Sequence, residues 1–143
     1  MKAKKGNDKG MFMNPIGYVR TEARELPKHC SISQVEGDLV LEDRYRDGME
    51  GIKPGDRIVV LFAFHESPPF SPEYLKQHPR GDLRRKKQGV FNLCSPLRPN
   101  PIGLSVVDVL GVSETVIRVK GIDMRDGTPI LDIKPERMFE KQG

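Results

Sequence analysis

The chain has 143 residues, of which 36% are hydrophobic and 31% are charged, and its formal net charge is +4. This length and composition favour one globular domain with a single core. No apolar run is long enough to span a bilayer, and no hydrophobic secretory segment follows the basic N-terminus, so we expect neither a membrane protein nor an exported one. Cys30 and Cys94 are then expected to be reduced thiols in the cytoplasm.

The N-terminal half predicts a basic tail followed by three strands. Residues 1–11, MKAKKGNDKGM, have little to bury and are predicted to be disordered until about Phe12. A strand is predicted at Ile16–Thr21, and a short one at Asp38–Glu42. Ile58–Phe64 is a continuous apolar run rich in β-branched and aromatic residues, which predicts a central strand that is buried on both faces.

The C-terminal half also consists mainly of strand signals. One strand is predicted at Val90–Cys94. The runs LSVVDVLGVS and TVIRVKGID are predicted to pair as a hairpin around Ser113-Glu114. The Asp126-Gly127 pair predicts a turn before a last strand at Ile130–Ile133.

Helical signals are few and short. LEDRYRDGMEGI could form one or two turns, ended by Gly48 or Gly51. SPEYLKQ could form another, with Ser71 as N-cap and Pro72 at the first helical position. The elements therefore predict a mostly β fold, either an antiparallel sandwich or a closed barrel, with one or two short helical turns. No βαβ pattern is present, so a Rossmann-type nucleotide site is not expected.

Two polar residues follow the buried strand directly. His65 and Glu66 should lie at its exposed carboxyl end, where a histidine could act as a base, contact a ligand or simply cap the strand. The three histidines and two cysteines show no paired metal-ligand spacing, so no metal site is expected.

A second pair of polar residues lies in GIDMRDGTP. Asp126 precedes Gly127 and is most simply a turn residue, because aspartate tolerates turn dihedrals and bonds to its own backbone. Asp123 stands near the end of an apolar strand and is the better candidate for a functional role.

The loop SPLRPNPIGLS, residues 95–105, is stiffened by three prolines. Arg98 and Asn100 each precede a proline, which favours an extended backbone at both positions. A rigid loop of this kind can preorganise polar groups of a binding site, or it can serve as a structural corner between strands.

The segment HPRGDLRRKKQG is strongly basic. Its cations, Arg80, Arg84, Arg85, Lys86 and Lys87, could attract a phosphate backbone, or could form a solvated loop that keeps the protein soluble.

Four motifs together resemble one known family. VVLFAFHES, HPRGD, QGVFNLCSPLRPNPIGLS and DGTPILDIKP occur in the order found in the TsaA-like, or TrmO-type, proteins, and the resemblance covers about Phe12 to Pro135. The boundaries expected from it are a tail at 1–11, a TsaA-like barrel domain at 12–137 and a C-terminal tail at 138–143.

The resemblance implies a fold, an activity and partners. Family members form a single small antiparallel β-barrel, act as homodimers and use S-adenosylmethionine to methylate N6 of threonylcarbamoyladenosine next to the tRNA anticodon. The implied partners are therefore a tRNA anticodon loop and a second copy of the chain, with no membrane and no metal.

The resemblance also implies site residues. His65 and Asp123 become candidates for the reacting centre, and the basic residues with Arg98 and Asn100 become candidates for contacts to the RNA. The implied cofactor contacts are His29, Cys30, Ser31, His65, Glu66, Cys94, Leu104, Gly121, Ile122 and Asp123.

The chain departs from the family pattern in two places. The family commonly has arginine where this chain has Cys94, and cysteine cannot replace a planar, multi-donor cation. Better-known members also continue beyond DIKP into a further domain that is thought to grip tRNA. Two alternatives therefore stay open: a barrel that binds S-adenosylmethionine or RNA without efficient catalysis, and a methyltransferase with a different substrate.

Overall fold

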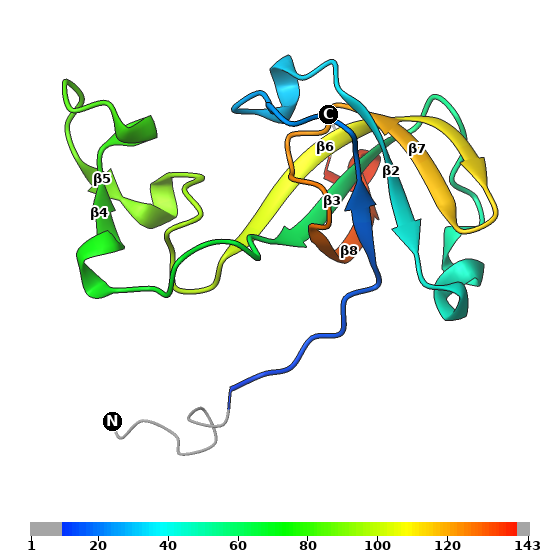
Figure 1. The fold of residues 1–143 in the computed structure, drawn as a ribbon, viewed down its shortest axis with the longest axis horizontal. Coiled ribbons are helices and arrows are strands. Elements are labelled where there is room, and N and C mark those ends of the chain that lie inside the picture. Colours follow the sequence, from blue (N-terminus) through cyan, green and yellow to red (C-terminus); the bar gives the residue numbers. More distant parts are fainter. Residues whose placement is uncertain (1–9, 140–143) are drawn as a thin grey trace.

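The computed structural model describes residues 10–139, and six antiparallel strands form its centre (Figure 1). Hydrogen bonding closes these strands into a barrel in the order β1-β2-β7-β6-β3-β8, which confirms the predicted mostly β, antiparallel fold. Their bounds are β1 Gly17–Arg20, β2 Glu36–Leu41, β3 Arg57–Ala63, β6 Ile102–Ser113, β7 Val116–Lys120 and β8 Pro129–Pro135. Most of the predicted N-terminal tail and of the predicted C-terminal tail lies outside the described residues.

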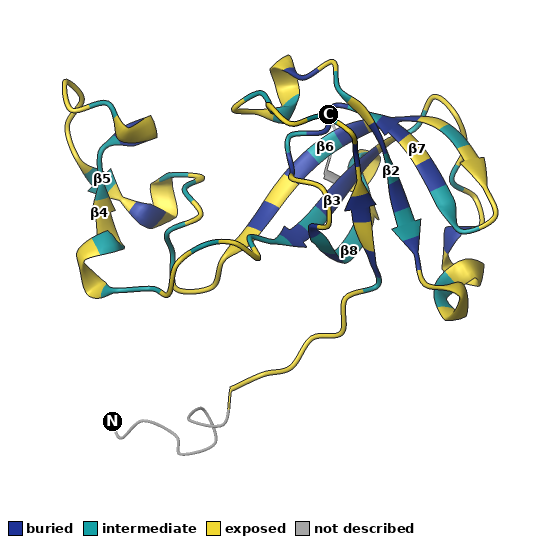
Figure 2. Cartoon of the chain, viewed as in Figure 1, coloured by how far each residue is buried: buried dark blue, intermediate teal, exposed yellow. Residues whose placement is uncertain are grey.

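The core fills the inside of this barrel. Residues alternate between the interior and the surface along β1, β2, β6 and β7, as the period of two in a strand requires (Figure 2). Leu39, Ile117 and Ile130 are fully buried there, and each contributes roughly 1.5–3 kcal/mol of burial free energy. The predicted central strand is confirmed, because β3 lies between β6 and β8 and buries Val59 as well as its inward-facing residues.

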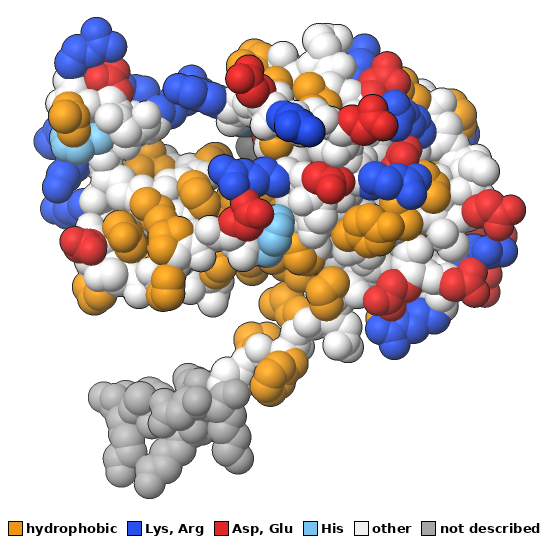
Figure 3. Space-filling model, in the orientation of Figure 1, with side chains coloured by type: hydrophobic (Ala, Val, Ile, Leu, Met, Phe, Trp, Pro, Cys, Tyr) orange, Lys and Arg blue, Asp and Glu red, His pale blue; other side chains and the backbone are white. Residues whose placement is uncertain are grey.

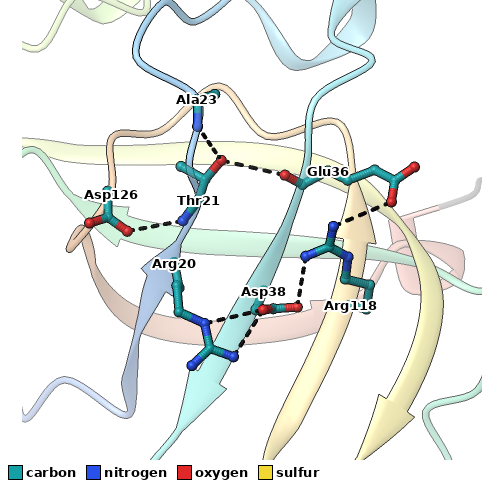
Figure 4. Close-up of polar contacts among 7 residues, drawn as sticks. All are labelled: Arg20, Thr21, Ala23, Glu36, Asp38, Arg118 and Asp126. Carbon is teal, nitrogen blue, oxygen red and sulfur yellow. Dashed lines mark hydrogen bonds and ion pairs between the residues drawn. The ribbon is translucent and has the colours of Figure 1, made fainter.

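A row of charges on the outside of the barrel matches the strand register. Arg20 on β1, Asp38 on β2 and Arg118 on β7 are direct cross-strand neighbours. The Asp38 carboxylate accepts hydrogen bonds from Arg20 at 2.9 and 3.2 Å and from Arg118 at 3.2 Å (Figure 4). Opposite charges in direct register disfavour a slip of one residue, which would separate them.

The Asp126-Gly127 turn is confirmed, and it ties two elements together. Gly127 has a φ of +83°, a conformation that glycine adopts without strain. Asp126 Oδ1 accepts a 2.9 Å hydrogen bond from the backbone N–H of Thr21 (Figure 4), and the Gly127 N–H donates to the Val19 carbonyl at 2.7 Å. Asp126 is therefore a structural residue that holds the loop before β8 against β1.

The predicted hairpin is confirmed with a shift of one residue in its turn. Ser113 pairs with Val116, so the two turn residues are Glu114 and Thr115. Glu114 has a φ of +56°, as the first turn residue of a tight hairpin loop requires.

Both predicted helical segments form 3-10 turns, and further short turns accompany them. Ser71 stands at the N-cap of η4, but its side chain makes no capping hydrogen bond. The short turns are η2 Cys30–Ile32, η3 Asp43–Met49, η4 Pro72–Leu75, η5 Pro79–Gly81, η6 Val90–Asn92 and η7 Glu136–Phe139.

The strand predicted at Val90–Cys94 is wrong. Val90–Asn92 is the turn η6, closed by a 3.0 Å hydrogen bond from the Leu93 N–H to the Val90 carbonyl. The preceding strand β5, Gln88–Gly89, pairs only with the two-residue β4, Lys76–Gln77. Val90 is buried, but Phe91 is 79% exposed, so the apolar letters here do not form one face of a sheet.

These short elements belong to an excursion from the barrel, residues 65–101, which we call the lobe. It leaves at the end of β3 and returns at the start of β6, and it stands to one side of the barrel (Figure 1). All of its residues are described, and only Pro79 and Val90 among them are buried (Figure 2). The lobe is instead held by polar contacts such as those of Gln77, whose side-chain amide donates to the carbonyls of Tyr74 and Leu97.

Candidate active site

A cavity of about 580 Å³ lies at one end of the barrel. Its volume is within the range of ordinary small-molecule sites. The end of β3 and the chain after it form one wall, and the loop between β7 and β8 forms another. The lining residues are Leu26, Pro27, Lys28, Phe62, Ala63, Phe64, His65, Glu66, Ser67, Pro68, Pro96, Asp123, Met124, Arg125 and Thr128. We call it the barrel-mouth cavity.

Asp123 is the half-buried carboxylate of this cavity. Its Oδ1 accepts a 2.6 Å hydrogen bond from the hydroxyl of Ser105, which points into the barrel from β6. Burial raises the pKa of Asp123 above its ordinary value, although the hydrogen bond from Ser105 and the nearby His29 oppose that rise. A carboxylate with a raised pKa is a stronger proton acceptor near neutral pH, which is the property required of a general base.

His65 and Glu66 lie on the wall formed by the chain after β3, as predicted for the end of the buried strand. His65 Nε2 is 3.8 Å from Glu66 Oε1, too far for a hydrogen bond, and the other Glu66 oxygen accepts a hydrogen bond from Arg125. The side chain of His65 is 31% exposed and that of Glu66 is 53% exposed, so a ligand in the cavity can reach both.

Two aromatic rings and one glycine fix the position of His65. Phe62 and Phe64 pack edge to face, with ring centroids 5.2 Å apart, immediately before the histidine. Both rings lie against Gly103 of β6, where a Cβ would be only 2.3 Å from the nearest ring atom of Phe62. The glycine of the R-P-N-P-I-G run is thus required by close packing under the cavity wall.

The segment His29–Ser31 docks on β6 beside Asp123. The Ser31 N–H donates to His29 Nδ1 at 3.0 Å, which makes His29 the N-cap of η2. The Val106 N–H donates to Cys30 Sγ at 3.4 Å, so Cys30 anchors the segment to the barrel. His29 lines a second cavity next to the first.

Of the ten implied cofactor contacts, only His65, Glu66 and Asp123 line the barrel-mouth cavity, and Leu104, Gly121 and Ile122 are among those that do not. Leu104 is 60% exposed and occupies an outward position on β6, opposite in direction to Ser105. The backbone N–H groups of Gly121 and Ile122 both donate to the Val35 carbonyl, and the Ile122 carbonyl accepts from Ser33. Within one chain, none of these three residues lines the cavity, and the hydrogen bonds of Gly121 and Ile122 fix the backbone just before Asp123.

The proline-rich loop is held in shape by Arg98, one of the residues expected to contact the RNA. Arg98 Nη1 donates to the carbonyls of Leu93 and Ser95 at 3.0 and 3.1 Å, so the guanidinium fixes the shape of the loop. Asn100 is exposed, and its carbonyl accepts from the Ile102 N–H at the start of β6. Cys94 is exposed and free, and it lines the second cavity.

The second cavity, of about 850 Å³, is formed mainly by the lobe. We call it the lobe cavity. It shares Lys28 and Pro96 with the barrel-mouth cavity, so the two adjoin. Three residues of the predicted basic set, Arg80, Arg85 and Lys87, line it, whereas Arg84 and Lys86 do not.

Sequence reasoning missed Ser105 and Arg125. The signal for Ser105 was available, because a serine at an inward position of a strand that otherwise turns valines inward requires a polar partner. Arg125 stands in the same GIDMRDGTP run as Asp123, but its pairing with Glu66 depends on the meeting of two distant segments. In the described part of the chain, no three His, Cys, Asp or Glu side chains gather to hold a metal ion, and no helix could cross a bilayer.

Comparison with known proteins identifies relatives of the whole described region. The family model of the tRNA-methyltransferase O N-terminal domain matches residues 18–138. A probable S-adenosyl-L-methionine-binding protein of Methanothermobacter thermautotrophicus is 35% identical, with 90% of this chain and 92% of the relative aligned. Another, from Methanocaldococcus jannaschii, is 41% identical, with 86% of this chain and 90% of the relative aligned.

A solved structure matches in the same way. The crystal structure of TrmO from Pseudomonas aeruginosa superposes with a TM-score of 0.68 and 32% identity, and the match covers 87% of this chain and 55% of that one. This chain therefore spans about half the length of that TrmO. The family match, the extent of the aligned relatives and the shared fold confirm the resemblance carried by the four motifs, and the chain belongs to the family of the tRNA-methyltransferase O N-terminal domain.

Proposed function

We propose that this protein is an S-adenosylmethionine-dependent methyltransferase that acts on N6 of threonylcarbamoyladenosine next to the anticodon of tRNA. Membership of the TrmO family and relatives named as S-adenosyl-L-methionine-binding proteins support the activity and the cofactor. The observation that carries the proposal is Asp123, a partly desolvated carboxylate held by Ser105 in a cavity of suitable size.

The residues of the barrel-mouth cavity fit S-adenosylmethionine by their chemistry. The partly exposed Phe64, Leu26 and Pro27 offer apolar and aromatic surface for an adenosine, whereas Phe62 and Met124 are almost fully buried. Glu66 and Asp123 offer negative charge to a sulfonium, and Arg125 offers a partner to a carboxylate. The cofactor, when bound, supplies an electrophilic methyl group.

The residues of the chain bind and orient the cofactor and the acceptor, and one of them removes a proton from the acceptor. Methyl transfer depends mainly on alignment of the reacting atoms, which a stiff wall of packed aromatic residues favours. The acceptor N6–H must also lose its proton. Asp123 is the proposed base because its raised pKa makes it a stronger proton acceptor than an ordinary aspartate, and His65, which lines the same cavity, is the alternative.

We propose that the active form is a homodimer. Large hydrophobic side chains are exposed on both the lobe and the outer face of β6, at Leu83, Phe91, Ile102 and Leu104. Exposed large apolar side chains are candidates for an interface, and a second copy that covers the outer face of β6 would bring Leu104 into it. Sedimentation equilibrium is expected to give twice the chain mass.

The substrate claim has a direct test. We expect transfer of label from methyl-labelled S-adenosylmethionine to tRNA that contains threonylcarbamoyladenosine, and none to tRNA prepared without that modification. Equal labelling of both tRNA pools, or transfer to neither, would refute the proposed acceptor.

Cys94 favours a second candidate function, a barrel that binds S-adenosylmethionine without efficient transfer. If the missing arginine limits cofactor binding, Cys94→Arg is expected to tighten S-adenosylmethionine binding by roughly tenfold, as a charge-assisted hydrogen bond would. Titration calorimetry measures this, with Cys94→Ser as the control that replaces the thiol without adding charge. Equal affinities of the arginine and serine variants would show that the chain tolerates the cysteine.

A further inference from the structure

The basic run of the lobe presents two different sets of charges. Arg85 and Lys87 line the lobe cavity. Arg84, which precedes them, and Lys86, which stands between them, do not. The run begins in a turn, in which the Arg85 N–H donates to the Asp82 carbonyl at 3.1 Å, so neighbouring side chains point in different directions. Arg84 instead pairs with Asp82 at 3.0 Å, with its side chain 90% exposed.

The lobe cavity gathers further cations from outside this run. Lys28 reaches it from the segment before η2, Lys76 from β4 and Arg80 from η5. No aspartate or glutamate is among its lining residues, all of which belong to the described chain. Figure 3 shows Lys and Arg side chains along the outer edge of the lobe and above the hollow between lobe and barrel. Such a concentration of unpaired positive charge in a concave site attracts polyanions.

The backbone of the lobe holds one of these cations in place. Arg80 has a φ of +54°, a conformation that costs free energy for a residue other than glycine. Hydrogen bonds on both sides maintain it: the Gly81 N–H donates to the His78 carbonyl at 2.9 Å, and His78 Nδ1 contacts the Arg85 carbonyl at 2.7 Å. Arg80 is therefore presented to the cavity by a constrained turn rather than by a loose loop.

The cavity also has an apolar surface between its charges. Pro79, Leu93, Pro96 and Leu97 contribute to the lining. Single-stranded RNA presents phosphates and unstacked bases together, and its recognition combines a positively charged groove with apolar contacts to bases. The bases of a duplex are stacked inside the helix and could not contact this apolar surface.

We propose that the lobe cavity binds the single-stranded RNA that flanks the methylated nucleotide, with its phosphates on Arg80, Arg85 and Lys87. The two cavities adjoin at Lys28 and Pro96, so an RNA strand whose target base enters the barrel-mouth cavity continues directly into the lobe cavity. This inference rests on the proposed function for the identity of the RNA, but the binding that it describes requires neither cofactor nor methyl transfer.

Two double variants with the same change in charge test the inference. The full chain, without cofactor, is titrated into a fluorescent RNA hairpin that carries a tRNA anticodon loop, and anisotropy is followed over a series of salt concentrations. Arg85→Ala with Lys87→Ala is expected to weaken binding about tenfold and to reduce the slope of log K against log salt by about 1.4, the value for two lost single-strand phosphate contacts. Arg84→Ala with Lys86→Ala is expected to change affinity less than about twofold.

Both variants keep the backbone contacts of the lobe, since Asp82 still accepts from the N–H of residue 84 and His78 still contacts the carbonyl of residue 85. Equal weakening by the two double variants would overturn the inference, because net charge alone would then explain binding. Loss of S-adenosylmethionine affinity in the Arg85 and Lys87 variant, measured by calorimetry, with unchanged RNA affinity would also overturn it.

The outcome is separable from that of the proposed function. Discrimination between the two double variants without labelling of threonylcarbamoyladenosine would retain the RNA site and refute the acceptor. Labelling of that acceptor with equal RNA binding by both variants would refute the RNA site alone.

Discussion

Asp123→Asn is expected to slow methyl transfer by roughly a hundredfold to ten-thousandfold, the usual contribution of a positioned general base. Asparagine retains an oxygen that can accept the 2.6 Å hydrogen bond from Ser105, so the cavity wall should keep its shape. It cannot accept a proton at neutral pH, so the step that needs a base is lost. Single-turnover transfer of labelled methyl to modified tRNA measures the effect.

The same substitution is expected to leave the fold as stable as before, or to stabilise it. Because the pKa of Asp123 is raised by burial, its contribution to stability is complete below the ordinary carboxyl pKa of 3.8 and is lost as the pH rises through the raised pKa. Asparagine does not ionise, so the variant does not lose stability in this pH range. The midpoint of thermal unfolding of the variant should therefore rise relative to that of the parent protein as the pH increases above about 4.

Asp126→Asn is the matched control for this prediction. It makes the same chemical change in the same loop, and asparagine can still accept from the Thr21 N–H. We expect its activity to match that of the parent. Full activity in the Asp123 variant would instead assign the role of base to His65.

Gly103→Ala is expected to destabilise the protein by about 2–3 kcal/mol and to reduce activity as well. The new Cβ would lie 2.3 Å from the Phe62 ring and 2.8 Å from that of Phe64, so at least one ring must move. Overpacking of this kind costs about 1–3 kcal/mol in a well-packed core. A displaced Phe64 would also displace His65, which follows it in the chain. Urea denaturation and the transfer assay together measure both effects.

Gly111→Ala is the control on the same strand. Nothing lies within 4 Å of a Cβ at Gly111, so we expect a change within about 0.5 kcal/mol. Combination of Gly103→Ala with Phe62→Leu should cost less than the sum of the single changes, because the smaller side chain makes room for the new methyl group. Strict additivity would show that the ring contact is not the cause.

The barrel could be predicted from the sequence because its strands carry their own pattern. Ile58–Phe64 is long, apolar and β-branched, and it forms β3 with one residue of difference at each end. The Asp126-Gly127 turn likewise follows from the conformational preferences of two adjacent residues. Local signals were sufficient wherever the partner of an element was a neighbouring strand of one closed sheet.

The lobe could not be predicted in the same way. The apolar letters of Val90–Cys94 resemble a strand, but the chain around them has only the two-residue β4 as a partner, and the segment turns instead. The role of Arg98 was open for a related reason. Its guanidinium bonds to carbonyls three and five residues earlier in the chain, which requires a fold-back that propensities do not encode.

The candidate site was predicted in its parts but not in its arrangement. The sequence indicated His65 and Asp123, and the structure places both at one cavity. The sequence analysis did not predict that Leu104 would face outward. Nor did it predict that only some residues of the basic run would line a cavity. The outward direction of Leu104 follows from the alternation of β6 once Ser105 is placed inward, whereas the basic run begins in a turn and has no apolar pattern that fixes which side chains line a cavity.

The attachment of the lobe has a consequence for how proteins built on this barrel can diversify. Ala63 and Ile102 are paired neighbours on β3 and β6, so the chain leaves and re-enters the sheet at a single rung of the ladder. Lengthening a connection between fixed ends adds only about 0.6 kcal/mol of closure entropy per doubling. The lobe can therefore change in length at little cost while β3 and β6 keep their pairing, so this rung is a place where the barrel tolerates an insertion.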